Sequence, residues 1–310
     1  MTRTSVVLYL SIIGILLISA IGWYVFAFRS QPTPTDQTPV KPDSTIFDGQ
    51  RAYADVQTQV AFGLRVPGSE GHAKIVDWIR MELEAAGWQV EVQESQALGH
   101  PIKNIVAKRN NESPQIIFGA HYDTRIYADS DPDPLKHKEP VPGANDGASG
   151  VAVLLELARS LPEDTPPIWL VFFDAEDNGN IAGWDWILGS REFVKNNSFQ
   201  PRAVVIVDLI GDVDLNIYKE YYSNPELTEE IWNTAKRLGY GDKFIPDYKH
   251  AVLDDHTPFV EAGMRAIDII DFDYPYWHTI EDTPDKVSAE SLDIVGKTLW
   301  TWVTQQSAQP

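Results

Sequence analysis

The sequence predicts an α/β fold, in which helices flank a central, mostly parallel sheet and one transmembrane helix precedes the domain. Strand-like and helix-like segments alternate along the chain, as in a parallel sheet with crossover helices. Residues 115–120, 168–173 and 203–207 are short apolar runs, each followed by a polar residue, as expected of strands buried on both faces. The 310 residues suffice for one large domain and a short additional segment.

The first half of the domain begins with a helix. Ser69 can cap this helix, its apolar residues follow helical spacing, and Gly87 lies just past its end. The elements expected next are strands at residues 88–92, 104–107 and 115–120, followed by a helix at residues 147–161.

The second half continues the alternation. We expect strands at residues 168–173, 203–207 and 265–270, a helix from Asn224-Pro225 to Gly239, and helices at residues 258–262 and 291–303. Ligands in such folds bind beyond the carboxyl ends of the strands. His121, Glu176, Asp177 and Asp208 follow strands, so we expect these four side chains at one edge of the sheet.

The N-terminal segment is predicted to anchor the protein in a membrane. Residues 5–28 carry no charge and lie between Arg3 and Arg29. At about 1.5 Å per residue, such a helix spans the roughly 30 Å hydrocarbon core. A cleaved signal peptide and a buried core helix remain the alternatives. We expect a membrane anchor at residues 1–29, a Pro/Thr-rich tether at residues 30–46, and an extracytoplasmic globular domain at residues 47–310.

Composition excludes several classes of function. Lys and Arg number 25 and Asp and Glu 45, so the formal net charge is −20. Such a chain repels the phosphate backbone, and we expect no nucleic-acid partner. The chain has no cysteine, which excludes disulfides, zinc ribbons, iron–sulfur clusters and thiol nucleophiles. Any metal must therefore be held by His, Asp or Glu.

The polar residues beyond the strands suggest a metal site. Adjacent carboxylates such as Glu176 and Asp177 at a buried strand end repel each other, so they need a cation or a shared proton. Asp146, Asp177 and His278 can supply three ligands and leave a fourth position for water or substrate, as in catalytic zinc sites. Glu176 can then move protons without binding the metal. The alternatives are a helix cap for Asp146, a hydrogen-bonded loop residue for His121, and a surface residue for His278.

Further candidates lie in loops. Asp254 begins an Asp-Asp-His stretch that is either a capping turn or part of a proton network. Trp277, beside His278, is a candidate wall of the substrate pocket. Trp184 and Trp186 lie in a predicted loop, where they either pack the loop or contact substrate. The remaining histidines are expected at the surface or in loops: His72, His100, His137 and His250.

Five ordered motifs resemble the zinc aminopeptidase family that also contains the animal-type glutaminyl cyclases. They are AHYDT around His121, GANDGASG from Gly143, FFDAED from Phe172, VDLIGD from Val207 and WHTIEDTPDKV from Trp277. The resemblance implies a single zinc-exopeptidase-like α/β domain that acts on the N-termini of peptides or proteins.

The resemblance implies two alternative sites. In the two-zinc aminopeptidases, the Asp at position 146 bridges both metals. His121 and Asp208 would then bind one zinc, and Asp177 with His278 the other. The Glu at position 176 would take a proton from the bridging water.

In the cyclases, one zinc is held at the positions of Asp146, Asp177 and His278. The acid at position 176 carries a proton from the α-amine to the departing ammonia, so that N-terminal glutamine becomes pyroglutamate. Asp208 and Asp254 would join a hydrogen-bonded acid network.

Particular residues favour the cyclase. LDDHTPF around Asp254 is similar to the cyclase form, and Trp277 directly before His278 is similar too. Asp177 departs from the commoner Glu, and His121 and Asp208 leave a second zinc open. The expected function is a zinc-dependent glutaminyl-peptide cyclotransferase, with an aminopeptidase and an inactive anchored binding domain as alternatives.

Overall fold

The computed structural model describes residues 46–110 and 112–307, and the structural statements below concern that part of the chain. The predicted anchor, residues 1–29, and the tether, residues 30–46, lie outside the described residues except for Ile46. Among the helices that are described, none is long and apolar enough to cross a membrane.

A six-stranded sheet, in the order β1-β2-β4-β3-β5-β8, forms the centre of the fold. Its strands are β1 (Gln89–Ala97), β2 (His100–Lys108), β3 (Ile116–His121), β4 (Ile168–Phe173), β5 (Ala203–Asp208) and β8 (Ala266–Ile270). Neighbours among β4, β3, β5 and β8 pair in parallel, whereas β2 is antiparallel to β1 and β4.

The sheet is mixed, and the predicted parallel arrangement holds for β4, β3, β5 and β8. Ala97 pairs with His100, so a two-residue turn, Leu98-Gly99, joins β1 to β2. Both turn residues have positive φ, 50° and 87°, which is the backbone that a tight hairpin requires. The hairpin therefore reverses β2 against the direction of the other five strands.

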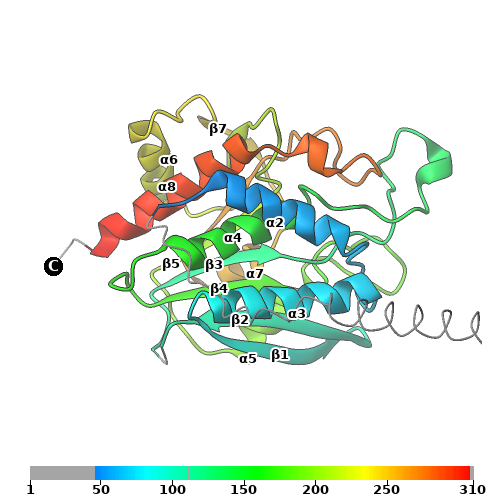
Figure 1. Ribbon diagram of the computed structural model, residues 1–310, viewed down its shortest axis with the longest axis horizontal. Coiled ribbons are helices and arrows are strands. Elements are labelled where there is room, and N and C mark those ends of the chain that lie inside the picture. Colours follow the sequence, from blue (N-terminus) through cyan, green and yellow to red (C-terminus); the bar gives the residue numbers. More distant parts are fainter. Residues whose placement is uncertain (1–45, 111, 308–310) are drawn as a thin grey trace, which may run out of the picture. The chain divides into compact units, whose positions relative to one another are not determined.

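Helices cover both faces of the sheet. They are α2 (Gly49–Ala61), α3 (Glu70–Ala85), α4 (Ala148–Ser160), α5 (Leu188–Asn196), α6 (Pro225–Arg237), α7 (Thr257–Glu261) and α8 (Ala289–Ser307), with short 3₁₀ helices at Pro134–Lys136 and Pro284–Lys286. Helices α2, α3, α4, α6 and α8 pack on one face, and α5 and α7 on the other. Figure 1 shows α2, α4 and α8 side by side. A second sheet pairs β6 (Ile217–Glu220) in parallel with β7 (Phe244–His250).

Helix α2 was not expected from the sequence, and its polar contacts explain why. Its buried positions include Asp55 and Gln59, which hide the apolar periodicity. A buried carboxylate of α4, Glu156, receives the guanidinium of Arg51 at 2.6 Å on each oxygen. The same carboxylate accepts the N–H of Asp48, the residue that caps α2. Glu156 therefore connects α2 to α4.

We predict that Glu156→Gln destabilises the domain by about 1–3 kcal/mol, because it weakens the hydrogen bonds that the buried carboxylate accepts from Arg51, which is 27% exposed, and from the cap of α2. The measurement is denaturant unfolding of the two proteins. Glu70→Gln is the matched control, since Glu70 is exposed and pairs only with Lys74 on the surface of α3. If both variants unfolded like the wild type, α2 would not depend on Glu156.

Candidate functional site

The carboxyl ends of three adjacent strands meet at one edge of the sheet. His121 is the last residue of β3, Glu176 and Asp177 follow β4, and Asp208 ends β5. In the register of β3 and β4, His121 lies opposite Phe173. Asp146 reaches the same edge from the loop before α4, and these side chains are at least nine-tenths buried.

The backbone turns sharply beside the site. Ala175, Leu209 and His278 are non-glycine residues with φ of 52°, 52° and 55°. A side chain in this left-handed region costs on the order of 1–3 kcal/mol, so surrounding contacts must enforce it. Ala175 directly precedes Glu176, and Leu209 directly follows Asp208. The strained backbone therefore lies at the ends of the strands.

Two buried carboxylates hold the backbone of the site residues. Asp123 accepts the N–H groups of Glu176 at 3.0 Å and Asp177 at 3.4 Å. Asp282 accepts the N–H groups of Asn145 at 2.8 Å and Asp146 at 3.1 Å. Neither carboxylate was singled out from the sequence, although both lie within the motifs that carry the family resemblance.

One group of possible metal ligands consists of Asp146, Asp177 and His278. The Nε2 atom of His278 lies 2.7 Å from Asp177 Oδ1 and 3.8 Å from Asp146 Oδ2. The Oδ2 atoms of both aspartates are buried and have no hydrogen-bond partner among the described residues. Two unpartnered carboxylate oxygens beside an imidazole fit a divalent cation such as zinc.

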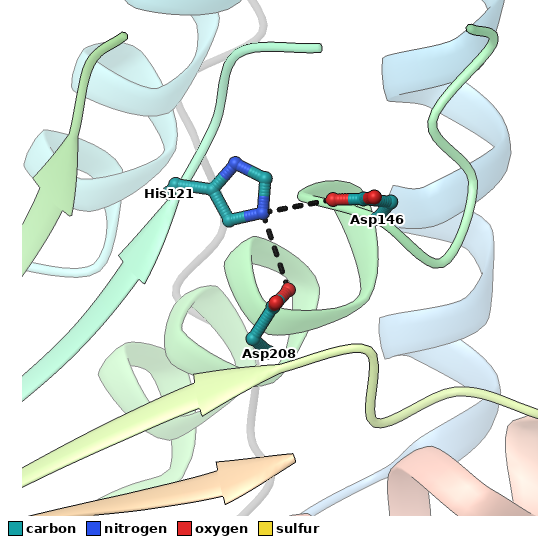
Figure 2. Close-up of side chains that lie close together, drawn as sticks. All are labelled: His121, Asp146 and Asp208. Carbon is teal, nitrogen blue, oxygen red and sulfur yellow. Dashed lines mark hydrogen bonds and ion pairs between the residues drawn. The ribbon is translucent and has the colours of Figure 1, made fainter. Parts of the chain in front are cut away.

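A second group shares Asp146 with the first. The Nε2 atom of His121 lies 3.1 Å from Asp146 Oδ1 and 3.2 Å from Asp208 Oδ1, and Figure 2 shows the imidazole between the two carboxylates. The donor set therefore resembles that of the first group. In both groups the imidazole Nε2 atom contacts a carboxylate, at 2.7 Å in the first and at 3.1 and 3.2 Å in the second, but the unpartnered Oδ2 atoms belong to Asp146 and Asp177.

Burial alters the proton affinity of these groups. It raises the pKa of Asp208 to about 7 and that of Glu176 well above its usual range. Burial alone would lower the pKa of His278, but the carboxylates of Asp177, Asp129 and Asp146 together outweigh it, and the pKa rises to about 9. Protons thus neutralise the crowded charges when no cation does so.

A pocket of about 210 Å³ opens beside these groups. Trp277 lines it as the sequence suggested, and so do Glu176, Asp208 and Asp254. The rest of its wall is formed by Asp146, Asp177, Trp186, Ala251, Val252, Leu253, Ile270 and Phe272.

Of the two loop tryptophans that were candidate substrate contacts, Trp184 and Trp186, the second lines the pocket. The ring of Trp184 stacks on His100 at a centroid distance of 3.6 Å and does not line the pocket. Trp186 lines the pocket, with its ring at 13° to that of His278 and 6.0 Å away. The two tryptophans are separated by one loop residue, so sequence spacing alone does not show which one faces the site.

A cluster of buried acids lies behind the pocket. Asp254 is 3% exposed, and Asp268 on β8 is buried near it, with neither carboxylate oxygen of Asp268 hydrogen-bonded among the described residues. His256 lies 3.4 Å from Glu220 and 3.8 Å from Asp268. Sequence reasoning pointed to Asp254 but missed Glu220 and Asp268, because neither adjoins a recognisable motif.

His72 is not a surface or loop residue as expected. It lies on α3, is 6% exposed, and its Nε2 atom is 2.7 Å from Asp174 Oδ1. Asp174 follows β4 directly, so this contact joins α3 to the strand that leads to Glu176. The contact with the Asp174 carboxylate explains why His72 is buried. The two residues are far apart in the sequence, so the pattern around His72 does not show this partner.

Comparisons with known proteins identify several similar chains. Residues 104–303 match the model of Peptidase family M28. The chain is 28% identical over 291 residues to a glutaminyl-peptide cyclotransferase of Bothrops jararaca, covering 78% of this chain and 77% of that protein.

Two solved structures are similar across the whole described domain. A glutaminyl cyclase of Porphyromonas gingivalis has a TM-score of 0.80 and 35% identity, covering 85% of this chain and 100% of that one. A Zn-dependent exopeptidase of Parabacteroides distasonis has a TM-score of 0.78 and 32% identity, covering 85% and 99%. The similarity thus includes both cyclases and exopeptidases.

We predict that zinc stabilises the protein after treatment with a chelator. Free zinc at 100 times its dissociation constant adds about 2.7 kcal/mol to the free energy of unfolding, because the ion binds the folded state. Thermal unfolding with and without zinc measures the effect, and His278→Ala should abolish it by removing a ligand. Identical unfolding of the wild type in both conditions would contradict a metal site.

Proposed function

The chain belongs to peptidase family M28, and on that premise we propose that it is a zinc-dependent glutaminyl-peptide cyclotransferase. Such an enzyme converts the N-terminal glutamine of peptides to pyroglutamate and releases ammonia. One observation carries the proposal: Glu176, with its raised pKa, lines the pocket beside the unpartnered oxygens of Asp146 and Asp177. A group that can hold a proton thus adjoins a set of metal ligands.

We propose that Asp146, Asp177 and His278 hold one zinc ion. The unpartnered Oδ2 atoms of both aspartates belong to this group, and this supports a single site. In the second group His121 contacts Asp146 and Asp208, and neither Asp208 oxygen is a buried atom without a hydrogen-bond partner among the described residues. When bound, the zinc would polarise the side-chain amide carbonyl of the substrate.

Glu176 would carry the proton that the reaction moves. The α-amine nitrogen of the substrate bonds to the side-chain amide carbon, and the bond from that carbon to the amide nitrogen breaks. Glu176 accepts a proton from the amine and gives it to the departing nitrogen, which leaves as ammonia. Burial raises the pKa of Glu176, with smaller contributions from Asp177 and Asp254. The carboxyl can therefore hold the proton taken from the amine until it passes to the leaving nitrogen.

Asp208 and Asp254 would support this step from the same pocket. Both carboxyls are buried beside Glu176, and burial raises the pKa of Asp208 to about 7. A protonated acid there can donate a hydrogen bond, whereas an ionised one would repel Glu176. Asp208 would thereby help to keep the carboxyl of Glu176 in its working protonation range, with Asp254 lining the same pocket.

A zinc aminopeptidase is the alternative that one observation favours. His121 and Asp208 still form a second group of possible ligands with Asp146, as a two-metal site requires. An inactive binding domain is not supported, since the named relatives are cyclotransferases and exopeptidases and the chain is accordingly an enzyme.

The two activities differ in their products. The purified protein is incubated with peptides that begin with glutamine and with peptides that begin with leucine. Release of ammonia from an otherwise intact glutamine peptide identifies a cyclase. Release of a free N-terminal residue identifies a peptidase and would contradict the proposal.

We predict that Glu176→Gln lowers turnover by about 10²–10⁴-fold, the range typical of a lost general acid–base group. The variant keeps the shape of the side chain, and Asp146, Asp177 and His278 are unchanged, so zinc should stay bound. Turnover and zinc content are measured on the same preparation. Loss of zinc together with activity would instead make Glu176 a ligand.

The pocket wall gives a second prediction. Trp186→Ala should raise the KM for a peptide substrate about tenfold, because an aromatic contact contributes about 0.5–1.5 kcal/mol beyond its buried area. Trp184→Ala is the matched control and should leave KM unchanged, since that ring lies on His100. Equal effects of both substitutions would remove Trp186 from the proposed subsite.

We also propose that residues 5–28 anchor the enzyme in a membrane, with the catalytic domain on the extracytoplasmic side. The uncharged run in the sequence supports this. The full-length protein should remain with membranes after a carbonate wash. Recovery of a soluble form trimmed near residue 28 would show that the segment is a cleaved signal.

A further inference from the structure

We propose that Arg125 and Asp129 form a positioning pair for the metal centre, in which Asp129 orients the ring of His278. Arg125 binds the carboxylate of Asp129. It also contacts the backbone of Asp177 and the ring of Trp186. The inference rests on the proposed function, because it assumes that zinc binds His278. Neither residue of the pair belongs to the ligand set itself.

The orientation of the His278 ring supports the role of Asp129. Nε2 of His278 faces Asp177 and Asp146, so this is the nitrogen that would bind the metal. Nδ1 must then carry the proton, and metal-binding histidines direct that N–H to a carboxylate, a carbonyl or water. Oδ1 of Asp129 lies 3.6 Å from Nδ1, an ion-pair distance, and favours the required tautomer by its charge.

The guanidinium of Arg125 determines where Asp129 lies. Its Nε and Nη2 atoms donate to the two carboxylate oxygens of Asp129 at 2.8 and 2.6 Å. Its remaining donors reach the backbone carbonyls of Asp177 at 2.9 Å and Gly179 at 3.2 Å. Arg125 is 2% exposed and Asp129 is 42% exposed, so the planar fork of a buried guanidinium holds a carboxylate that is partly open to water. The Arg125 side chain therefore links Asp129, which faces His278, to the backbone of Asp177.

The same guanidinium supports the pocket wall. Arg125 lies over the ring of Trp186, 5.0 Å from its centroid, and Trp186 lies parallel to His278. The backbone N–H of Ser130, the residue after Asp129, donates to the carbonyl oxygen of His278 at 3.2 Å. This segment thus contacts both the side chain and the strained backbone of His278.

The test compares four proteins by their affinity for zinc. Asp129→Asn removes the charge at constant size, and Arg125→Lys keeps the charge but loses the planar fork. Loss of a hydrogen-bonded partner of a metal ligand typically weakens metal binding about 10–100-fold. Since Asp129 lies at ion-pair distance from His278, we expect the lower end of that range, about tenfold, in Asp129→Asn and in Arg125→Lys. Glu261→Gln is the control, since Glu261 pairs with Arg191 at the exposed surface. Zinc dissociation constants are measured by competition with a chromogenic chelator.

A double variant shows whether the two residues act together. Because Arg125 acts on His278 through Asp129, combining both substitutions should weaken zinc binding no more than the larger single effect. Because Asp129 is the ion-pair partner of the buried Arg125, Asp129→Asn should also lower the stability of the metal-free protein, so zinc affinity is measured well below the unfolding midpoint, where each variant is folded. A change in the zinc dissociation constant under those conditions distinguishes positioning from a loss of fold. Arg125→Lys should in addition raise KM through Trp186, whereas Asp129→Asn should not.

Several outcomes would overturn the inference. One is wild-type zinc affinity in folded Asp129→Asn while His278→Ala loses zinc, and another is a double variant whose zinc affinity falls by the sum of the two single effects. A wild-type protein that binds no zinc would overturn the proposed function, and this inference with it. The His278→Ala measurement therefore separates the two failures.

Discussion

The crowding of carboxylates at one edge of the sheet is the constraint on which the rest of the site depends. Asp146, Glu176, Asp177 and Asp208 converge there because parallel strands bring their carboxyl ends together. Burial raises the pKa of Glu176, Asp177 and Asp208, so the site needs positive charge or bound protons. A divalent cation satisfies this need for the ligands, while Glu176 remains able to hold a proton.

The protein fixes these groups through its backbone. The carboxylates of Asp123 and Asp282 accept hydrogen bonds from backbone N–H groups in the segments that carry the side chains of the site. These bonds hold the loops while Ala175 and His278 occupy the left-handed region. Positions enforced in this way need little rearrangement when a ligand binds, which favours both metal binding and catalysis.

The parts that sequence could predict are those with a local signal. The buried strands β3, β4 and β5 were predicted because each is an uninterrupted apolar run, and the family motifs lie at their ends. Helix α2 escaped prediction because Asp55 and Gln59 are buried through partners elsewhere in the chain. Arg125 escaped for the same reason, since its role arises from contacts across loops. Trp186 was named with Trp184 as a candidate, but only the contacts in the structure tell the two apart.

Diffraction at the zinc absorption edge, from crystals grown with zinc, tests the central claim most directly. The account predicts one anomalous peak, among Asp146, Asp177 and His278, with His121 and Asp208 remaining in contact with each other. A second peak of similar height between His121 and Asp208 would contradict the single-zinc cyclase and favour a two-metal peptidase. Absence of a peak beside His278 would contradict the proposed centre altogether.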